Sequence, residues 1–295
     1  MPEDDLSKLD PRLHAFRPDL ADIALKGHVE AARFVAGRQM RVAAPLAPVR
    51  REPSDAAPLD TEALRGELVT VFETGANGWS WVQLAGDGYV GWIPSVALTE
   101  PGSEPTHKTS AIRTFVFSKP DIKSPPLAGL PLGACVTVIG EAEDRNARYF
   151  LIEPEGAIVV QHMVPLDHAS TDWTAIAERF LGVPYLWGGK SSLGIDCSGL
   201  VQVALGACGI AAPRDSDMQA ETAGRALPLN DGLPALKRGD LVFWPGHVAI
   251  MRDAETLVHA AGYRLEVVVE PLADLAGRQL VRNLHVSAIR RCVTD

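Results

Sequence analysis

The chain has 295 residues, of which 46% are hydrophobic and 22% charged, so it contains enough apolar sequence to bury a sizeable core. Near-ordinary glycine and proline contents exclude a collagen, a coiled coil and a wholly disordered chain, and about 100–200 residues per domain predicts two or three domains. A formal charge of −9, without any basic stripe, argues against a protein that follows a nucleic-acid backbone.

The N-terminus and the cysteines indicate the compartment. The first ten residues are acidic and polar, whereas a secretion signal needs a basic start and then an apolar stretch. The most apolar run, 199–213, is interrupted by Gln202 and is shorter than the ~20 residues that span a bilayer. The four cysteines form no C-x-x-C pair, which argues against a zinc ribbon and a disulfide framework. We therefore expect a cytoplasmic protein with no membrane segment, metal or cofactor.

The first hundred residues change character near residue 40. Residues 1–39 include a stretch, 19–35, with room for one or two short helices, so we expect a helical lead-in that packs on the next domain. From residue 40 there are short β-rich runs, VTVF, WSWVQL and YVGWI, separated by glycine-containing turns. This pattern is typical of a small all-β barrel.

A second barrel is predicted from an internal repeat. A shift of 68 residues, without a gap, places LVTVFE over VTVIGE and GYVGWIPSVAL over GAIVVQHMVPL. The repeat predicts one barrel at 40–100 and a second at 106–167. Most aromatic residues of the first barrel are expected to fill its core, and Tyr89, close to Gly91, is the one expected to face a ligand.

The last part of the chain has mixed secondary structure. Helices are expected at 173–181 and 198–207, on either side of a glycine-rich turn, and they are followed by apolar strand sequences at 240–251, 256–260 and 265–270. The sequence predicts an α+β domain at 172–295.

Cys197 has the position of a nucleophile. It lies in VPYLWGGKSSLGIDCSGLVQ, where the apolar helical run starts just after Asp196. At a helix N-terminus the macrodipole and the free N–H groups favour the thiolate, so the sequence predicts a partly activated thiol. A cysteine in an apolar helix more often fills the core; Cys208 fits that interpretation, whereas Cys197 has polar neighbours.

Two histidines are the candidate partners of the thiol. His247 and His259 lie in apolar strand sequences on either side of residues 252–255. A hairpin closed at residue 253 would place them directly opposite each other, with Cβ atoms ~5 Å apart, so that one imidazole orients the other. With Cys197 they would supply the nucleophile, base and orienting group of a papain-like triad. A metal site is the alternative, but no third ligand occurs at metal-binding spacing.

Four motifs carry a family resemblance. YxWGG with DCSGLV, GDLVFW, GHVAI and LVHAAG occur in this order over about 173–295, which resembles the NlpC family of papain-like cysteine peptidases that cut bacterial cell-wall peptides. The preceding barrels resemble the bacterial SH3-like domains of members that release dipeptides from murein peptides. The resemblance implies an α+β papain-like cysteine peptidase domain preceded by two small all-β SH3-like barrels, the first of which caps the substrate site.

The resemblance also implies roles for catalytic residues. Cys197 is the nucleophile, His247 the general base and acid, and His259 the residue that orients His247. Tyr185 matches a tyrosine that helps to stabilise the oxyanion, a role suited to a phenol donor.

Substrate-binding residues are implied in the same way. Asp196 and Tyr89, with an acidic residue of the first barrel for which Glu52 is the candidate, would hold the free amine of an N-terminal L-alanine. Asp196 also fits a helix N-cap. Arg214 and Asp215 are expected to form a structural pair near the site. The residues that would hold the D-glutamate are Ser198, Ser216 and Trp187.

The implied substrate is a murein tripeptide or tetrapeptide with a free N-terminal L-alanine. The chain would cut L-Ala-γ-D-Glu from meso-diaminopimelate or L-lysine at the γ-glutamyl amide, as a monomer that meets recycled wall fragments inside the cell. The alternatives are a non-catalytic murein-fragment binding protein and an amidase or acyltransferase on the same fold. Binding of proline-rich peptides by the barrels has only the shared fold in its favour.

Overall fold

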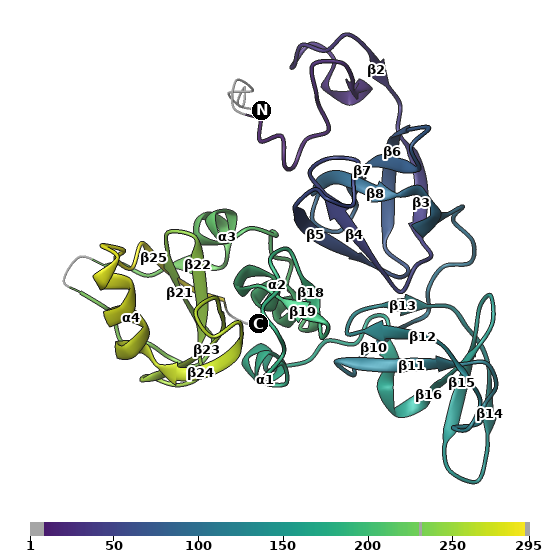
Figure 1. The fold of residues 1–295 in the computed structure, drawn as a ribbon. Helices are drawn as coiled ribbons and strands as arrows, with labels where there is room; N and C mark the ends of the chain where they lie inside the picture. Colours follow the sequence, from purple (N-terminus) through teal and green to yellow (C-terminus); the bar gives the residue numbers. More distant parts are fainter. Residues whose placement is uncertain (1–8, 230–231, 293–295) are drawn as a thin grey trace. The chain divides into compact units, whose positions relative to one another are not determined.

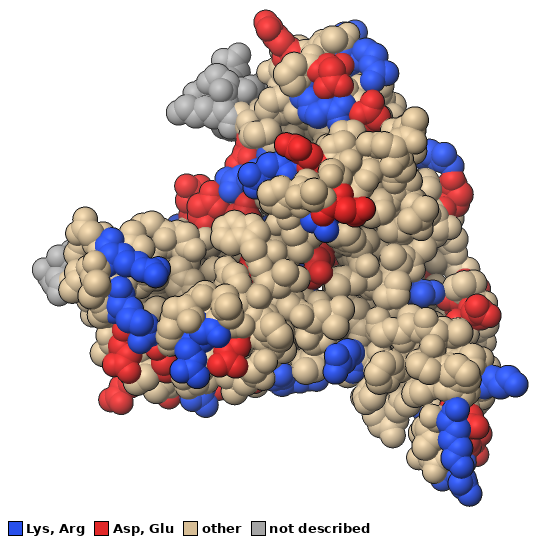
Figure 2. All heavy atoms as spheres, in the orientation of Figure 1, with Lys and Arg blue, Asp and Glu red and all other residues tan. Residues whose placement is uncertain are grey.

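The computed structural model describes residues 9–229 and 232–292 (Figure 1). In this part of the chain, no helix is both long and apolar enough to cross a bilayer. Acidic and basic side chains are interspersed over the face drawn in Figure 2, and neither sign forms a continuous strip there.

Contacts divide the chain into two compact units. The first contains the residues up to Thr109 together with Thr114–Leu166, and the second contains Ser110–Arg113 and the residues from Asp167 onward. All the predicted catalytic residues therefore lie in the second unit.

In the described part of the lead-in, residues 9–39, the structure has two short strands and one 3-10 turn where the sequence predicted helices. Its elements are β1 (Ala21–Asp22), the 3-10 turn η2 (Ile23–Leu25) and β2 (Phe34–Val35). No residue of η2 is buried, and the chain becomes extended again at Lys26. A short helix is stabilised mainly by burial of an apolar face, which this segment does not provide.

The first barrel is one seven-stranded sheet with the order β5-β4-β8-β7-β6-β3-β9. Its apolar core includes Val49, Val82 and Ile93, which come from three adjacent strands. The elements are β3 (Arg38–Val42), β4 (Leu46–Arg50), β5 (Leu59–Leu64), β6 (Leu68–Thr74), β7 (Trp79–Leu84), β8 (Val90–Pro94), η3 (Ser95–Ala97) and β9 (Leu98–Thr99).

The second barrel repeats this strand order in two sheets, β12-β11-β16-β15-β14 and β13-β10-β17. Its separate core includes Val116, Ile152 and Ile158. The elements are β10 (His107–Thr109), β11 (Arg113–Phe117), β12 (Pro126–Pro131), β13 (Cys135–Val136), β14 (Val138–Glu143), β15 (Arg148–Ile152), β16 (Ala157–Val159), η4 (Val160–His162) and β17 (Met163–Pro165).

The constant shift of 68 residues between the barrels is wrong. Gly91 lies so close to β4 that a Cβ atom there would meet Val49. Gly156 has the same relation to Val116 of β11. Gly156 is 65 positions after Gly91, whereas Val116 is 67 positions after Val49, so corresponding loops differ in length. The close approach expected at Gly91 is thus made by the barrel's own backbone.

The second unit is built on a six-stranded sheet with the order β20-β25-β21-β22-β23-β24. Its helices are α1 (Trp173–Glu178), α2 (Cys197–Ala207), α3 (Ser216–Thr222) and α4 (Leu272–Val281). Its strands are β18 (Lys190–Ser191), β19 (Gly194–Ile195), β20 (Arg225–Ala226), β21 (Asp240–Trp244), β22 (His247–Met251), β23 (Thr256–Ala261), β24 (Glu266–Pro271) and β25 (Ala288–Arg291).

The two faces of this sheet are covered by different helices (Figure 1). Alternate residues of a strand point to opposite faces, so His247, Ala249 and Met251 of β22 share one face. Ala249 and Met251 pack with Leu275, which places α4 over this face. α2 contacts β22 and β23 from the other side. The two histidines of the predicted triad therefore point to the side covered by α4, while Cys197 comes from the helix on the other side.

Two glycines explain why the Cys197 segment folds tightly. A Cβ atom on Gly199, in the first turn of α2, would collide with the carbonyl oxygen of Gly189. A Cβ atom on Gly189 would in turn collide with the backbone of Gly194. Backbone therefore packs directly on backbone, and the loop before α2 is held against the start of the helix.

We expect Gly199→Ala to destabilise the second unit by about 1–3 kcal/mol, because its methyl group overlaps backbone that has little room to move. Gly206→Ala is the matched control in the same helix, since nothing lies within 4 Å of the added Cβ. That change should stabilise the helix by about 0.5–1 kcal/mol. Calorimetry of the two full-length variants measures both effects, and an unchanged transition in Gly199→Ala would contradict the packing argument.

Candidate active site

Cys197 is the first residue of α2, as the sequence predicts, and Asp196 is the N-cap. The Asp196 carboxylate accepts a hydrogen bond from the backbone N–H of Gly199 at 2.7 Å. Cys197 is only 6% exposed. The backbone N–H of Val248 is close enough to favour its thiolate, which places the sulfur beside the start of β22.

Asp196 is surrounded by donors. Arg214 forms a bidentate ion pair with it, at 3.0 and 2.7 Å, and is itself only 1% exposed. Gly188 N–H donates at 2.7 Å, and the Ser198 hydroxyl donates at 3.3 Å and accepts from Arg214 at 2.9 Å. With Gly199 these groups occupy the roughly four lone-pair sites of a carboxylate, so the geometry supports the N-cap role and not amine binding.

Arg214 thus has Asp196 as its buried ion-pair partner, a pair that the sequence did not predict. A bidentate guanidinium–carboxylate pair is among the strong hydrogen-bonded contacts, and breaking it would leave an uncompensated buried charge. It ties the segment before α3 to the start of α2.

His247 and His259 meet, but not in the predicted register. In the hairpin Met251 pairs with Leu257 and Ile250 with Val258, so His259 lies two residues away from the position directly opposite His247. The two residues are diagonal neighbours on one face, a spacing that long side chains can bridge. Nε2 of His247 and Nδ1 of His259 are 2.7 Å apart, so the predicted contact between the imidazoles is present.

Glu270 adds a second hydrogen bond to the contact between the two imidazoles. Its Oε1 atom is 2.8 Å from Nε2 of His259. An ionised carboxylate can only accept, so His259 donates from Nε2 and its Nδ1 atom is free to accept from Nε2–H of His247. This leaves Nδ1 of His247 without a proton, as a base. The Glu270 carboxylate thereby fixes the tautomers of both imidazoles.

Two further groups contact the Glu270 carboxylate. The Tyr263 hydroxyl donates to its second oxygen at 3.1 Å, and Arg278 of α4 forms an ion pair with that oxygen. The Arg278 guanidinium also lies 4.2 Å from the centroid of the Tyr263 ring. Burial and the charge of Arg278 lower the pKa of His259 to about 4, so this imidazole is neutral at neutral pH, as the chain of donors requires.

Two parts of the chain match known protein families. Residues 182–281 match the model of the NlpC/P60 family, and residues 49–98 match a model described as the bacterial dipeptidyl-peptidase Sh3 domain. The second unit carries an NlpC/P60 domain. The chain thus combines an NlpC/P60 domain with a bacterial SH3-like domain, which confirms the predicted family resemblance and fold class.

Relatives support this assignment over longer stretches. The chain is 28% identical over 247 residues to a γ-D-glutamyl-L-lysine dipeptidyl-peptidase of Bacillus cereus, covering 74% of this chain and 72% of the relative. It is 27% identical over 259 residues to dipeptidyl-peptidase 6 of Lysinibacillus sphaericus, covering 79% and 91%. A crystal structure of an NlpC/P60 family protein from Bacillus cereus has the same fold, with a TM-score of 0.71 at 21% identity over 87% of this chain and 100% of that one.

Of the other predicted site residues of the NlpC/P60 domain, Tyr185 lies close to Cys197. The pKa of Tyr185 is raised by burial and by the proximity of Cys197 and Asp196, so its hydroxyl stays protonated and able to donate. Ser198 is buried, whereas Trp187 is 64% exposed on the loop before β18. Ser216 is the first residue of α3.

Tyr89 and Glu52 belong to the first unit. Tyr89 is grouped with the core of the first barrel, and Glu52 is exposed in the loop between β4 and β5. Their roles toward substrate stay predictions. The sequence analysis missed Glu270. One signal was present, since Glu270 is one of two acidic residues, with Glu266, in the otherwise apolar strand that follows His259.

The prediction of a partly ionised thiol is opposed by burial. Burial raises the pKa of Cys197 to about 12, and the Asp196 carboxylate adds to this rise. Burial and the neighbouring His259 lower the pKa of His247 to about 3, although Glu270 opposes the change. Both shifts favour the uncharged forms of the thiol and the imidazole, so a reaction at Cys197 would need a group that accepts the thiol proton.

We expect alkylation of Cys197 by iodoacetamide to speed up about tenfold per pH unit from about pH 6 to 9, because an acid of raised pKa loses its proton only as the pH rises. Peptide mass spectrometry reads the rate at this residue. Cys208, the C-cap of the same helix with a pKa raised by burial, is the internal reference. A plateau at Cys197 alone, already reached near pH 6, would indicate a thiolate–imidazolium pair and contradict this expectation.

We expect Glu270→Gln to lower kcat for the murein peptides suggested by the sequence by about 10–1000-fold with little change in KM, because an amide can donate to His259 and stabilise the wrong tautomer. The pH profile of kcat should shift with it. Tyr263→Phe is the control, since it removes another donor to Glu270 and leaves the acceptor of His259 intact. Equal losses in the two variants would show a merely structural role for Glu270.

Proposed function

We propose that this protein is a cysteine peptidase that hydrolyses the γ-D-glutamyl–diamino acid bond of murein peptides with a free N-terminal L-alanine and releases L-Ala-γ-D-Glu. The observation that carries the proposal is the hydrogen-bonded chain from His247 through His259 to Glu270, next to a cysteine at a helix N-terminus. The bond is suggested by the name of one relative, the γ-D-glutamyl-L-lysine dipeptidyl-peptidase of Bacillus cereus.

Acylation begins with the thiol of Cys197. Its sulfur attacks the γ-carbonyl carbon of D-glutamate while the unprotonated Nδ1 atom of His247 takes the thiol proton. The developing imidazolium is stabilised by its hydrogen bond to His259, which Glu270 supports. Transfer of the proton to the departing amine completes cleavage of the C–N bond and leaves a thioester on Cys197.

Deacylation uses the same groups in reverse order. The neutral His247 accepts a proton from water as the water oxygen attacks the thioester carbon. The sulfur leaves, regains a proton from His247, and the dipeptide L-Ala-γ-D-Glu is released with a new carboxylate.

The oxyanion of both tetrahedral intermediates needs donors near Cys197. The backbone N–H of Cys197 is at the first turn of α2, where it is not used within the helix. The protonated Tyr185 hydroxyl is the proposed second donor. One such donor is worth about 2.7–4 kcal/mol of transition-state stabilisation.

The test is hydrolysis of L-Ala-γ-D-Glu-L-Lys and L-Ala-γ-D-Glu-meso-diaminopimelate, followed by mass spectrometry. We expect L-Ala-γ-D-Glu as a product, and a loss of at least about 10⁴-fold in kcat for Cys197→Ala, because the nucleophile cannot be replaced. A Cys197→Ala variant that keeps wild-type turnover would overturn the proposal.

Calorimetric titration of Cys197→Ala with the tripeptide separates the alternatives. Binding without cleavage by both wild type and variant indicates a murein-fragment binding protein, and a product other than L-Ala-γ-D-Glu indicates an amidase or acyltransferase. Equal cleavage of a peptide whose alanine amine is linked to muramic acid would contradict the requirement for a free N-terminus.

A further inference from the structure

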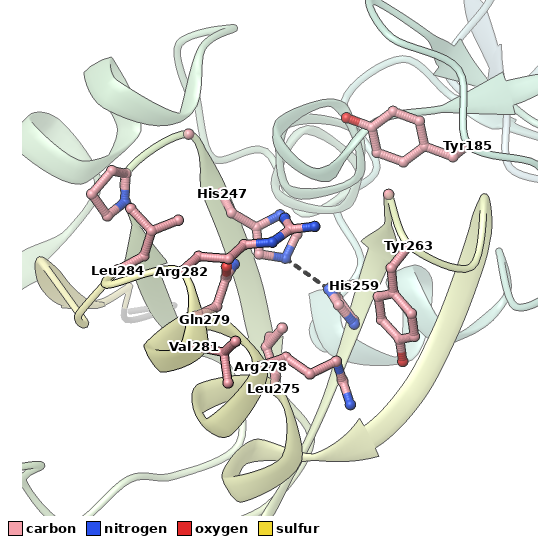
Figure 3. Close-up of a pocket in the computed structure, with 13 residues that line it drawn as sticks. Tyr185, His247, His259, Tyr263, Leu275, Arg278, Gln279, Val281, Arg282 and Leu284 are labelled. Carbon is pink, nitrogen blue, oxygen red and sulfur yellow. Dashed lines mark hydrogen bonds between the residues drawn. The ribbon is translucent and has the colours of Figure 1, made fainter.

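A pocket of about 600 Å³ lies beside the histidine pair, between the sheet and α4 (Figure 3). His247, His259 and Tyr185 line one part of it. The other part is formed by residues of α4 and the chain that follows, among them Arg278, Gln279 and Arg282. In Figure 3 the Arg282 side chain extends from the end of α4 toward His247.

The pocket combines apolar walls with positive charge. Thirteen described residues line it, and none of them is acidic. Tyr263, Leu275 and Leu284 provide apolar surface, while Arg278 and Arg282 provide two guanidinium groups. A ligand with a short methylene chain and a carboxylate would match both properties.

The two arginines differ in their partners. The charge of Arg278 is compensated by its ion pair with Glu270. Arg282 is the C-cap of α4, is exposed, and forms no ion pair with any residue that the structure describes. Arg282 is therefore the cation of this pocket that is available to an incoming anion.

The position of the pocket identifies the part of the substrate that enters it. His247 must come within hydrogen-bond distance of the departing amine nitrogen in order to protonate it. Whatever that nitrogen carries occupies the space on the outer side of His247, and the pocket begins there. On the proposed function, that group is the diamino acid after the cut.

We propose that this pocket binds the leaving diamino acid and that Arg282 binds one of its carboxylates. The inference rests on the proposed function and adds specificity to it. Two carboxylates have the right chemistry, the α-carboxylate shared by lysine and diaminopimelate and the side-chain carboxylate that only diaminopimelate has. A terminal ammonium group without a carboxylate, as in lysine, is disfavoured near two guanidinium groups.

The experiment compares three peptides, L-Ala-γ-D-Glu followed by meso-diaminopimelate, by L-lysine or by L-lysine amide, with wild type and Arg282→Gln. We expect KM to rise about tenfold in the variant for peptides whose carboxylate Arg282 binds, with kcat nearly unchanged, because the contact exists before and during the reaction. A rise for diaminopimelate alone assigns the side-chain carboxylate. A rise for diaminopimelate and lysine but not for the amide assigns the α-carboxylate.

Arg225→Gln is the matched control, because Arg225 is an exposed arginine of β20 that does not line the pocket. Its kinetics should equal those of the wild type for all three peptides. If Arg282→Gln also matches the wild type for all three, the pocket assignment is overturned while the proposed function stands. If the wild type cleaves none of them, the proposed function fails, and the pocket assignment fails with it.

Discussion

The hydrogen bond between two imidazoles is the contact on which the catalytic arrangement depends. Two neutral histidines can bond in either direction, and only one direction leaves a basic nitrogen at the outer end. Glu270 removes this ambiguity because an ionised carboxylate cannot donate. Arg278 and Tyr263 in turn contact Glu270, so in the proposed mechanism residues on β24 and α4 set the direction of proton transfer at Cys197.

A second buried carboxylate performs a different task. The Asp196 carboxylate accepts hydrogen bonds from the backbone of the loop before α2, from the first turn of α2 and from Arg214. These contacts fix the position of Cys197, and they occupy the lone pairs with which the carboxylate could accept a further hydrogen bond. The two acidic groups thus differ in their contacts. Asp196 holds the segment that carries the Cys197 sulfur, and Glu270 sets the tautomers of His247 and His259.

The sequence predicted which residues of the second unit meet better than it predicted the register of the strands that carry them. Cys197 was placed correctly because a capping residue, glycines and an apolar run all indicate the same helix start. The contact between His247 and His259 was foreseen on the right face but in the wrong register. The side chain of Asp253 accepts from the N–H groups of Glu255 and Thr256, a turn geometry that alternation alone does not reveal.

Other features depend on contacts between segments that are distant in sequence. The prediction of a constant 68-residue offset between the barrels was wrong because corresponding loops differ in length. A comparison without gaps cannot detect such a difference. The roles proposed for Glu270 and Arg282 depend on the placement of β24 and α4 beside the two histidines. The prediction of helices in the lead-in was wrong for the described residues, because composition does not show that no residue of the 3-10 turn is buried.

The protonated, buried state of Cys197 has a consequence for the lifetime of the protein. Oxidation of a cysteine to sulfenic and then irreversible sulfinic acid follows its thiolate character and its exposure. Cys197 is low in both, so peroxide should find a poor target in the free protein. In the proposed mechanism, the same burial that makes Cys197 depend on a base would therefore also protect its sulfur between turnovers.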